Sequence, residues 1–268
     1  MEVTGRALVV NRLHFPVTAL GPGRRLGLWT QGCSVRCAGC LALDTWEPGD
    51  GVRLTAGDFR EVWRRALDQG ADGLTVSGGE PGDQPEALTT VLRTAREEAA
   101  GREADLLVYT GHPLAELLRR APALAAEGLV DAVISEPFRA DAPTTLIWRG
   151  SANQTVTPFT SLGHERYGPH LEHRPERAPM QLLASDQDVW LIGVPRRGEL
   201  AALQTALRSA GFRHGQVSWR PAPAMGPGAD RRAEPVADGR HTTPAARPRP
   251  DSSTAGPDGP ATRKDTDR

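Results

Sequence analysis

Short apolar runs alternate with amphipathic stretches along most of the chain. Continuous or alternating apolar residues predict four strands: 72–77, 105–109, 129–134 and 188–194. An apolar repeat of about 3.6 residues predicts four helices: 58–70, 84–99, 113–120 and 198–210. Strands that alternate with helices favour an α/β fold, in which a parallel sheet carries its helices on the outside. We expect an incomplete (βα) barrel with its active loops at the carboxyl ends of the strands.

Weaker local patterns extend this picture towards both ends of the chain. Alternating and β-branched residues over 6–29, interrupted by a glycine–proline–glycine turn at 21–23, predict a hairpin that leads into a cysteine-rich loop. Shorter apolar runs near 145–148 and at 216–219 predict two further strands. In the first helix, Asp58 and Glu61 are expected to form a capping box.

Composition divides the chain into three parts. Residues 1–160 contain the clear strand and helix alternation and are the expected core, and 161–220 are expected to form a βαβ-like extension. A polar loop over 160–186 is expected to join the two. Residues 221–268 hold almost no large apolar side chain, so they cannot bury enough surface to offset the entropy lost on ordering, and a disordered tail is expected.

Charge and hydropathy exclude some classes of partner. The formal net charge is −1, with 24% charged and 38% hydrophobic residues, and nothing in this balance favours binding to nucleic acid or to a membrane. Almost every basic residue is arginine, so arginine alone does not indicate a binding patch. The N-terminal residues lack a secretion signal, and no apolar run approaches the roughly 18 residues that span a bilayer. A cytoplasmic protein is expected.

Three cysteines carry the strongest chemical signal. Cys33, Cys37 and Cys40 are the only cysteines in the chain, and all lie within one short loop. An odd number of neighbouring thiols does not form a disulfide framework, whereas clustered reduced thiols most often bind metal. Spacings of three and two residues let one loop supply three thiolates to a [4Fe–4S] cluster. One iron then lacks a cysteine ligand and stays open to a small molecule, as catalytic zinc does.

Two other interpretations of the cysteines remain open. A Cys₃His zinc site needs a histidine, but His14 and the other histidines are remote in sequence, and structural zinc sites usually use paired Cys-x-x-Cys knuckles. If the three thiols bound no metal, their crowding into one short loop would have no explanation. A second motif, Gly78-Gly79-Glu80, follows a predicted strand. Its glycines would let the backbone approach a ligand closely, although most glycine pairs are simple turns.

Together these motifs resemble the radical SAM superfamily. The Cys-x-x-x-Cys-x-x-Cys loop follows a strand, and Ser77-Gly78-Gly79-Glu80-Pro81 stands about one strand and helix later. The segments Asp44-Thr45-Trp46, Tyr109-Thr110-Gly111 and 148–154 narrow the resemblance to the activases of glycyl-radical enzymes, over roughly residues 8–158.

The resemblance implies a cofactor set and a reaction. A [4Fe–4S] cluster on the three cysteines would bind S-adenosylmethionine, which Gly39–Leu41 (Gly39, Cys40 and Leu41) and Gly78–Glu80 (Gly78, Gly79 and Glu80) would hold. Reductive cleavage would give a 5′-deoxyadenosyl radical that removes hydrogen from a glycine of a partner glycyl-radical enzyme, with flavodoxin or ferredoxin as electron donor.

Two departures keep other functions open. Relatives tend to carry Asp-Gly-Pro-Phe after the fourth strand, where this chain has Ser135-Glu136-Pro137-Phe138, and short activases end near residue 154. These differences favour, as an alternative, radical modification of a small molecule or a peptide in a biosynthetic pathway. A third possibility is a non-enzymatic iron–sulfur sensor or electron carrier.

Overall fold

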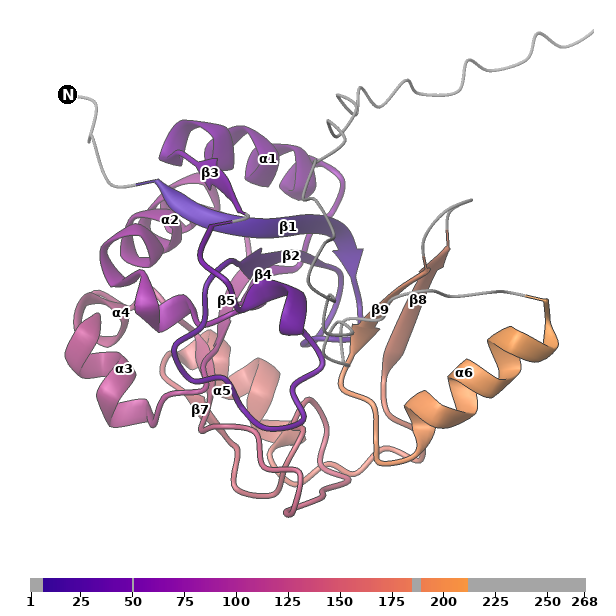
Figure 1. Ribbon diagram of the computed structural model, residues 1–268. Helices are drawn as coiled ribbons and strands as arrows, with labels where there is room; N and C mark the ends of the chain where they lie inside the picture. Colours follow the sequence, from indigo (N-terminus) through magenta and orange to yellow (C-terminus); the bar gives the residue numbers. More distant parts are fainter. Residues whose placement is uncertain (1–6, 50, 185–188, 212–268) are drawn as a thin grey trace, which may run out of the picture. The chain divides into compact units, whose positions relative to one another are not determined.

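The described residues form one seven-stranded sheet and a separate two-stranded sheet (Figure 1). The computed structural model describes residues 7–49, 51–184 and 189–211. The strands of the large sheet are β1 (Leu8–Val17), β2 (Arg25–Thr30), β3 (Val52–Leu54), β4 (Gly73–Gly78), β5 (Asp105–Tyr109), β6 (Ala132–Ser135) and β7 (Thr155–Pro158). The α-helices between and after them are α1 (Ala56–Asp68), α2 (Pro85–Glu98), α3 (Leu114–Arg120), α4 (Ala123–Ala126) and α5 (Ser161–Tyr167).

The large sheet is mostly parallel and open. Its strand order is β3-β1-β2-β4-β5-β6-β7, and the four central strands β2, β4, β5 and β6 pair in parallel. Only the outer pairs are antiparallel: β1 with β2 and β3, and β6 with β7. The edge strands β3 and β7 do not pair with each other, so the sheet does not close. The predicted α/β architecture with a largely parallel sheet is confirmed.

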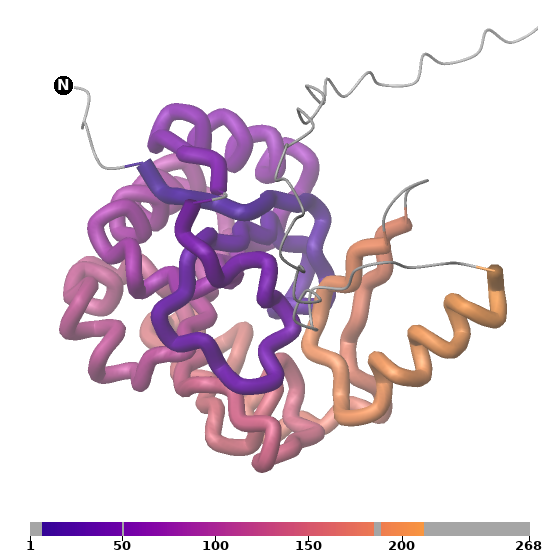
Figure 2. The backbone as a smooth tube through the Cα atoms, in the orientation of Figure 1, coloured from indigo at the N-terminus to yellow at the C-terminus, as the bar shows by residue number. Residues whose placement is uncertain are grey.

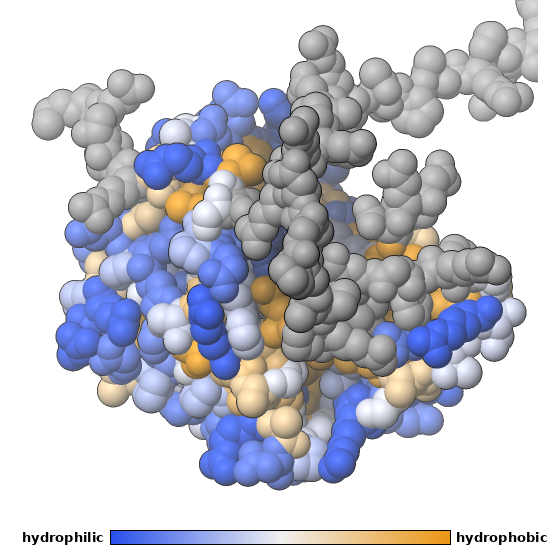
Figure 3. Space-filling view, viewed as in Figure 1, coloured by the Kyte–Doolittle hydropathy of each residue, from blue (hydrophilic) through white to orange (hydrophobic). Residues whose placement is uncertain are grey.

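Successive side chains of each strand point to opposite faces of the sheet. On β5, Leu106 and Val108 pack into the core formed with α1 and α2, whereas Leu107 and Tyr109 face the opposite side. Trp63 of α1 is fully buried in that core and donates its indole N–H to the carbonyl of Ala95, 3.0 Å away. Figure 3 shows mostly hydrophilic residues over α3 and α4, as expected for helices that cover a sheet.

A buried ion pair lies at the amino ends of the strands, on the face of the sheet opposite α1 and α2. Arg25 and Asp105, the first residues of β2 and β5, are both fully buried and lie 2.7 Å apart. Arg25 also donates to the hydroxyl of Thr75 at 2.6 Å. From α5, Arg166 donates to Asp105 at 2.7 Å and the Tyr167 hydroxyl donates to the same carboxylate. The network therefore joins three central strands to α5.

Several expected elements differ in their ends or positions. The capping box of α1 is formed by Thr55 and Asp58, one turn before the expected pair of Asp58 and Glu61, because the Thr55 hydroxyl accepts the Asp58 backbone N–H. The strand expected near 145–148 is wrong. Trp148 has a left-handed φ of 61°, and its ring packs edge-on against Tyr167, so this apolar run covers α5 as a loop. The strand beside β6 is β7 instead.

The C-terminal extension contains more structure than its polar sequence indicated. The loop expected over 160–186 is wrong, because it holds α5 and the strand β8 (Met180–Ala184). β8 pairs antiparallel with β9 (Val189–Gly193), and α6 (Glu199–Ser209) follows. The described part of the extension thus has the order α5–β8–β9–α6, with a hairpin where a βαβ unit was expected. The strand expected at 216–219 and the tail expected at 221–268 lie outside the described residues, and the domain boundaries stay a prediction.

Among residues 7–49, 51–184 and 189–211, no helix has both the length and the apolar character that crossing a membrane requires.

Replacing Arg25 by methionine is expected to lower the free energy of unfolding by about 3–5 kcal/mol, because the buried Asp105 carboxylate loses its bidentate partner. Arg93→Met is the matched control: its pair with Glu127 is half exposed, and its loss should cost about 1 kcal/mol or less. Urea denaturation measures both. Equal effects for the two variants would contradict this account of the buried pair.

The same network gives a pH dependence. Burial alone would raise the pKa of Asp105, but the charge of Arg25 and the hydrogen bonds from Arg25, Tyr167 and Arg166 hold it below its ordinary value. The stability that this carboxylate supplies is therefore complete above its ordinary unfolded pKa of about 4 and is lost as the pH falls through the lowered folded value. Unfolding curves of Asp105→Asn should show less loss of stability at acidic pH than the unchanged protein shows.

Candidate functional site

The cysteine loop leaves the carboxyl end of β2 and is closed by its own backbone. Figure 2 traces it from the end of β2 back to β3. The N–H of Gly32 donates to the carbonyl of Thr45 at 2.8 Å, and that of Cys33 to Trp46 at 3.1 Å. The buried side-chain amide of Gln31 donates to the carbonyl of Glu47 at 2.6 Å. These bonds form a neck that holds the three cysteines in one loop.

The glycine pair after β4 lies directly under this neck. The N–H of Gly79 donates to the carbonyl of Thr30 at 2.9 Å, and the N–H of Glu80 donates to that of Gly32 at 2.8 Å. A methyl group at position 79 would lie 2.1 Å from the Gly32 carbonyl oxygen, and one at position 78 would lie 2.2 Å from the nitrogen of Thr30. Gly78 also has a left-handed φ of 111°. Only residues without a side chain allow the loop and strand to approach so closely.

Glu80 ties the ends of two strands together. Its side chain is almost fully buried, and Oε1 accepts hydrogen bonds from the hydroxyl of Thr110 and the N–H of Gly82, each at 2.7 Å. Oε2 accepts the N–H of Gly111, also at 2.7 Å. Burial raises the pKa of Glu80, against the opposite effect of these three donors. The carboxylate thus joins the segment after β4 to the segment after β5.

Asp83 holds the cysteine loop from another side. One carboxylate oxygen accepts the backbone N–H of Ser34 and the other accepts the Ser34 hydroxyl, each at 2.7 Å. The Nε2 of His112 lies 3.3 Å from the second oxygen. Both ends of the cysteine loop and its first turn are therefore fixed to the carboxyl edge of the sheet.

Backbone N–H groups lie near the sulfurs of the cysteine loop. Those of Val35 and Arg36 act to lower the pKa of Cys33, but burial has the larger effect and raises it. Hydrogen bonds from backbone N–H groups to thiolate ligands are a normal means by which proteins tune iron–sulfur clusters.

The other two thiols have equivalent donors. Phe138 supplies an N–H to the sulfur of Cys37, whose pKa burial also raises, and Ala42 donates to the Sγ of Cys40 at 3.4 Å. All three cysteines are free and partly exposed. No disulfide occupies them, so all three sulfurs are available as metal ligands.

Among the described residues, no group of three or more His, Cys, Asp or Glu side chains is placed to hold one metal ion. A zinc site needs its ligands to meet at one point, at about 2.0–2.3 Å from the metal. The irons of a cubane occupy separate corners, so thiolates that bind different irons do not need to converge. The half-exposed thiols with N–H donors therefore suit a [4Fe–4S] cluster.

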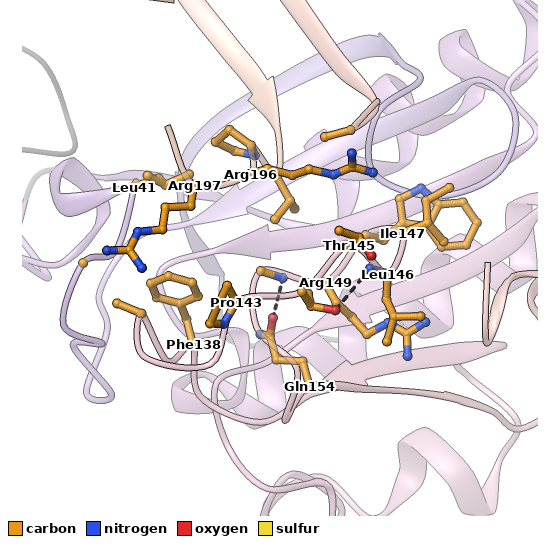
Figure 4. Close-up of a pocket in the computed structure, with 18 of the residues that line it drawn as sticks. Leu41, Phe138, Pro143, Thr145, Leu146, Ile147, Arg149, Gln154, Arg196 and Arg197 are labelled. Carbon is orange, nitrogen blue, oxygen red and sulfur yellow. Dashed lines mark hydrogen bonds between the residues drawn. The ribbon is translucent and has the colours of Figure 1, made fainter. Parts of the chain in front are cut away.

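A cavity of about 510 Å³ opens beside the cysteine loop (Figure 4). Gly39, Cys40 and Leu41 line it, together with Ser77 at the end of β4 and Tyr109 at the end of β5. The remaining wall comes from segments 138–154, 175–179 and 194–200, so the extension contributes to it. A volume of this size is typical of sites for small molecules and cofactors.

The expected S-adenosylmethionine contacts fall into two groups. Gly39, Cys40 and Leu41 line the cavity, whereas Gly78, Gly79 and Glu80 are not among its lining residues and instead support the loop. The assignment of both groups to the cofactor stays a prediction.

The sequence did not indicate several of the lining residues. Ser77 and Phe138 both stand in motifs that the sequence analysis singled out, but no contact with the cavity was predicted for either. For residues 194–200 no such motif existed, because they are distant in sequence from the cysteines.

The segment at 148–154 braces the loop after β6. Asn153 donates to the carbonyl of Pro137 at 2.8 Å, and Gln154 donates to that of Glu136 at 3.1 Å. The Oε1 of Gln154 also accepts the N–H of Gly150 at 2.7 Å. Glu136 has a left-handed φ of 86°, which is uncommon for a residue with a side chain. The amide side chains thus hold the turn at Glu136 and Pro137, and Phe138, which follows it, lines the cavity.

Fold and site together define an α/β protein with a cluster-binding loop at the carboxyl edge of a parallel sheet. Residues 19–157 match the family described as 4Fe-4S single cluster domain. The chain is 33% identical to the anaerobic ribonucleoside-triphosphate reductase-activating protein of Vibrio cholerae over 152 residues, which cover 55% of this chain and 96% of the relative.

Two further relatives carry the same name. The protein of Escherichia coli K12 is 33% identical over 53% of this chain and 94% of its own length, and that of Enterobacteria phage T4 is 29% identical over 51% and 85%. The chain therefore belongs to the 4Fe–4S single cluster domain family, as a radical SAM enzyme of the glycyl-radical activase type.

Gly79→Ala is expected to destabilise the protein by about 1–3 kcal/mol and to reduce bound iron after anaerobic reconstitution, because the new methyl group meets the Gly32 carbonyl. Gly57→Ala in α1 is the matched control, since its nearest neighbour would lie 3.7 Å away and the helix favours alanine. Thermal unfolding and iron analysis measure both changes. Full iron content in Gly79→Ala would contradict the role given to the close approach.

Proposed function

We propose that Cys33, Cys37 and Cys40 hold a [4Fe–4S] cluster and that the protein installs a glycyl radical on a partner enzyme of the anaerobic ribonucleoside-triphosphate reductase class. When bound, the cluster and S-adenosylmethionine together supply a 5′-deoxyadenosyl radical by reductive cleavage of the sulfonium. The partner is inferred from the names of relatives that match nearly their whole length to this chain.

One observation carries the proposal. Three partly exposed thiols lie in a single loop, and the chain contains no fourth cysteine. A cluster held at three corners leaves one iron open to a small ligand. A site built only to pass electrons would normally have all four irons ligated by protein.

The chain's own residues bind, orient and exclude water. Cys40 and Leu41 bring the cysteine loop to one side of the cavity, and Ser77 and Tyr109 bring the ends of two strands to another. Apolar lining residues such as Phe138 keep water away from this space. Excluding water protects a reactive radical from side reactions and strengthens polar contacts to the bound nucleotide.

A second candidate is radical modification of a small molecule or a peptide. The observation that favours it is the extension, which has no counterpart in relatives that match over 94–96% of their own length. Residues 194–200 of this extension form part of the cavity wall. A small substrate that entered the cavity would be enclosed by this wall.

Each of Cys33→Ala, Cys37→Ala and Cys40→Ala is expected to lose the cluster and to reduce formation of 5′-deoxyadenosine to background. The protein is reconstituted anaerobically with iron and sulfide, reduced with dithionite and given S-adenosylmethionine. Ser34→Ala is the matched control, since it loses one hydrogen bond to Asp83 but no expected ligand, and should keep the cluster. A cysteine variant with unchanged turnover would refute the ligand assignment, and an intact cluster without any product would favour a sensor or electron carrier.

The partner is tested by electron paramagnetic resonance. Mixing the reduced holoprotein with S-adenosylmethionine and an anaerobic ribonucleoside-triphosphate reductase should give the signal of a glycyl radical on the reductase. Product formation without this signal, with the reductase from the same genome, would favour the second candidate.

A further inference from the structure

The cavity beside the cysteine loop has an unbalanced charge. Four arginines line it: Arg139, Arg149, Arg196 and Arg197. Its lining residues include no Asp or Glu, although the whole chain contains 33 acidic residues against 32 basic ones. A cavity lined by one sign of charge between low-dielectric walls concentrates ligands of the opposite sign. This wall therefore favours a ligand that carries a negatively charged group.

Two of the four arginines are already engaged. Arg139 pairs with Asp141 at 2.9 Å, which neutralises its charge locally. Arg149 is largely buried and donates to the carbonyl of Leu171. Its position is fixed by the loop after α5, and its Nε is buried without a hydrogen-bond partner among the described residues.

The other two belong to the extension and differ from each other. The guanidinium of Arg196 donates to the carbonyl of Glu176 at 2.7 Å and to that of Pro175. Arg197 is exposed, and within the described part of the chain it has no hydrogen bond or ion pair. In Figure 4 both lie on the opposite side of the cavity from Arg149 and Gln154. Arg197 is thus the cavity arginine that is both exposed and without a side-chain partner among the described residues.

Arg197 shares its cavity with the cysteine loop. Cys40 and Leu41 line the same space, so a ligand held by Arg197 lies in the cavity in which the radical would form. The matched relatives lack the extension that supplies Arg197. A contact from this residue would therefore distinguish the substrate of this protein from theirs.

We propose that Arg197 binds a carboxylate side chain on the partner segment that carries the reacting glycine, so that the extension selects an acidic segment. This inference rests on the proposed activase function. A guanidinium presents a planar fork of donors that matches a carboxylate. The exposed position keeps the contact modest in strength, and its main effect is on which segment enters the cavity.

The experiment compares the binding of two sets of short capped peptides with a central glycine. One set carries a single Asp at one of the positions flanking the glycine, and the other carries Asn at the same position. Fluorescence anisotropy gives their dissociation constants for the anaerobic holoprotein with S-adenosylmethionine, for Arg197→Gln and for Arg197→Lys. Arg208→Gln is the matched control, because it removes an exposed arginine from α6 that does not line the cavity.

We expect at least one Asp peptide to bind roughly fivefold more tightly than its Asn counterpart. Arg197→Gln should abolish this preference, Arg197→Lys should restore part of it, and Arg208→Gln should retain it. Equal binding of every Asp and Asn pair would overturn the proposal. Binding of inorganic phosphate or AMP that depends on Arg197, without a preference for Asp, would show that the anion is a phosphate and would also overturn it.

A separate measurement tests whether Arg197 binds the cofactor instead. Equilibrium dialysis gives the affinity of S-adenosylmethionine for the holoprotein, and a weaker affinity in Arg197→Gln would assign the arginine to the cofactor and refute the proposal. The peptide comparison needs no turnover. If no 5′-deoxyadenosine forms but the Asp preference is present, the proposed function fails while the anion-binding role of Arg197 stands.

Discussion

The close approach of the cysteine loop to the end of β4 is the constraint on which the site depends. Two successive residues without side chains, Gly78 and Gly79, let the backbone after β4 bond directly to Thr30 and Gly32. The neck of the loop is thereby held at the carboxyl edge of the sheet, and the thiols lie next to the cavity. Any side chain at these positions would separate the loop from the strand that positions it.

Stability and chemistry occupy opposite ends of the same strands. At the amino ends, the buried Arg25–Asp105 pair joins β2, β4 and β5 to α5. At the carboxyl ends, Glu80 joins the segments that follow β4 and β5 beside the cavity. Parallel strands place all their carboxyl ends at one edge, so loops that are distant in sequence meet there. The ion pair fixes the strands, and the loops at the other end are then positioned by them.

Much of the core could be predicted from the sequence, because its strands and helices carry strong apolar periods. The strand at 105–109 matches β5, and the helix at 84–99 differs from α2 (Pro85–Glu98) by one residue at each end. There are physical reasons why other elements were not predicted. β7 and β8 are short and partly exposed, and α5 is polar except where it faces the core, so no period revealed them.

The candidate site was predictable only where one local motif contained it. The cysteine spacing indicated the cluster loop, and the glycine motif indicated a close backbone approach. The sequence could not show that Glu80 would be enclosed by Thr110 and Gly111, or that Arg197 would reach the cavity, because both depend on tertiary packing. Contacts between residues that are far apart in the chain leave no local pattern.

The central claim is a cluster that three cysteines hold with one iron open to S-adenosylmethionine. Mössbauer spectroscopy of protein reconstituted with ⁵⁷Fe tests it most directly, because it resolves the irons of one cluster. The account predicts a [4Fe–4S] spectrum in which a single iron changes its isomer shift when S-adenosylmethionine is added. A spectrum of another cluster type, or one that S-adenosylmethionine leaves unchanged, would contradict it.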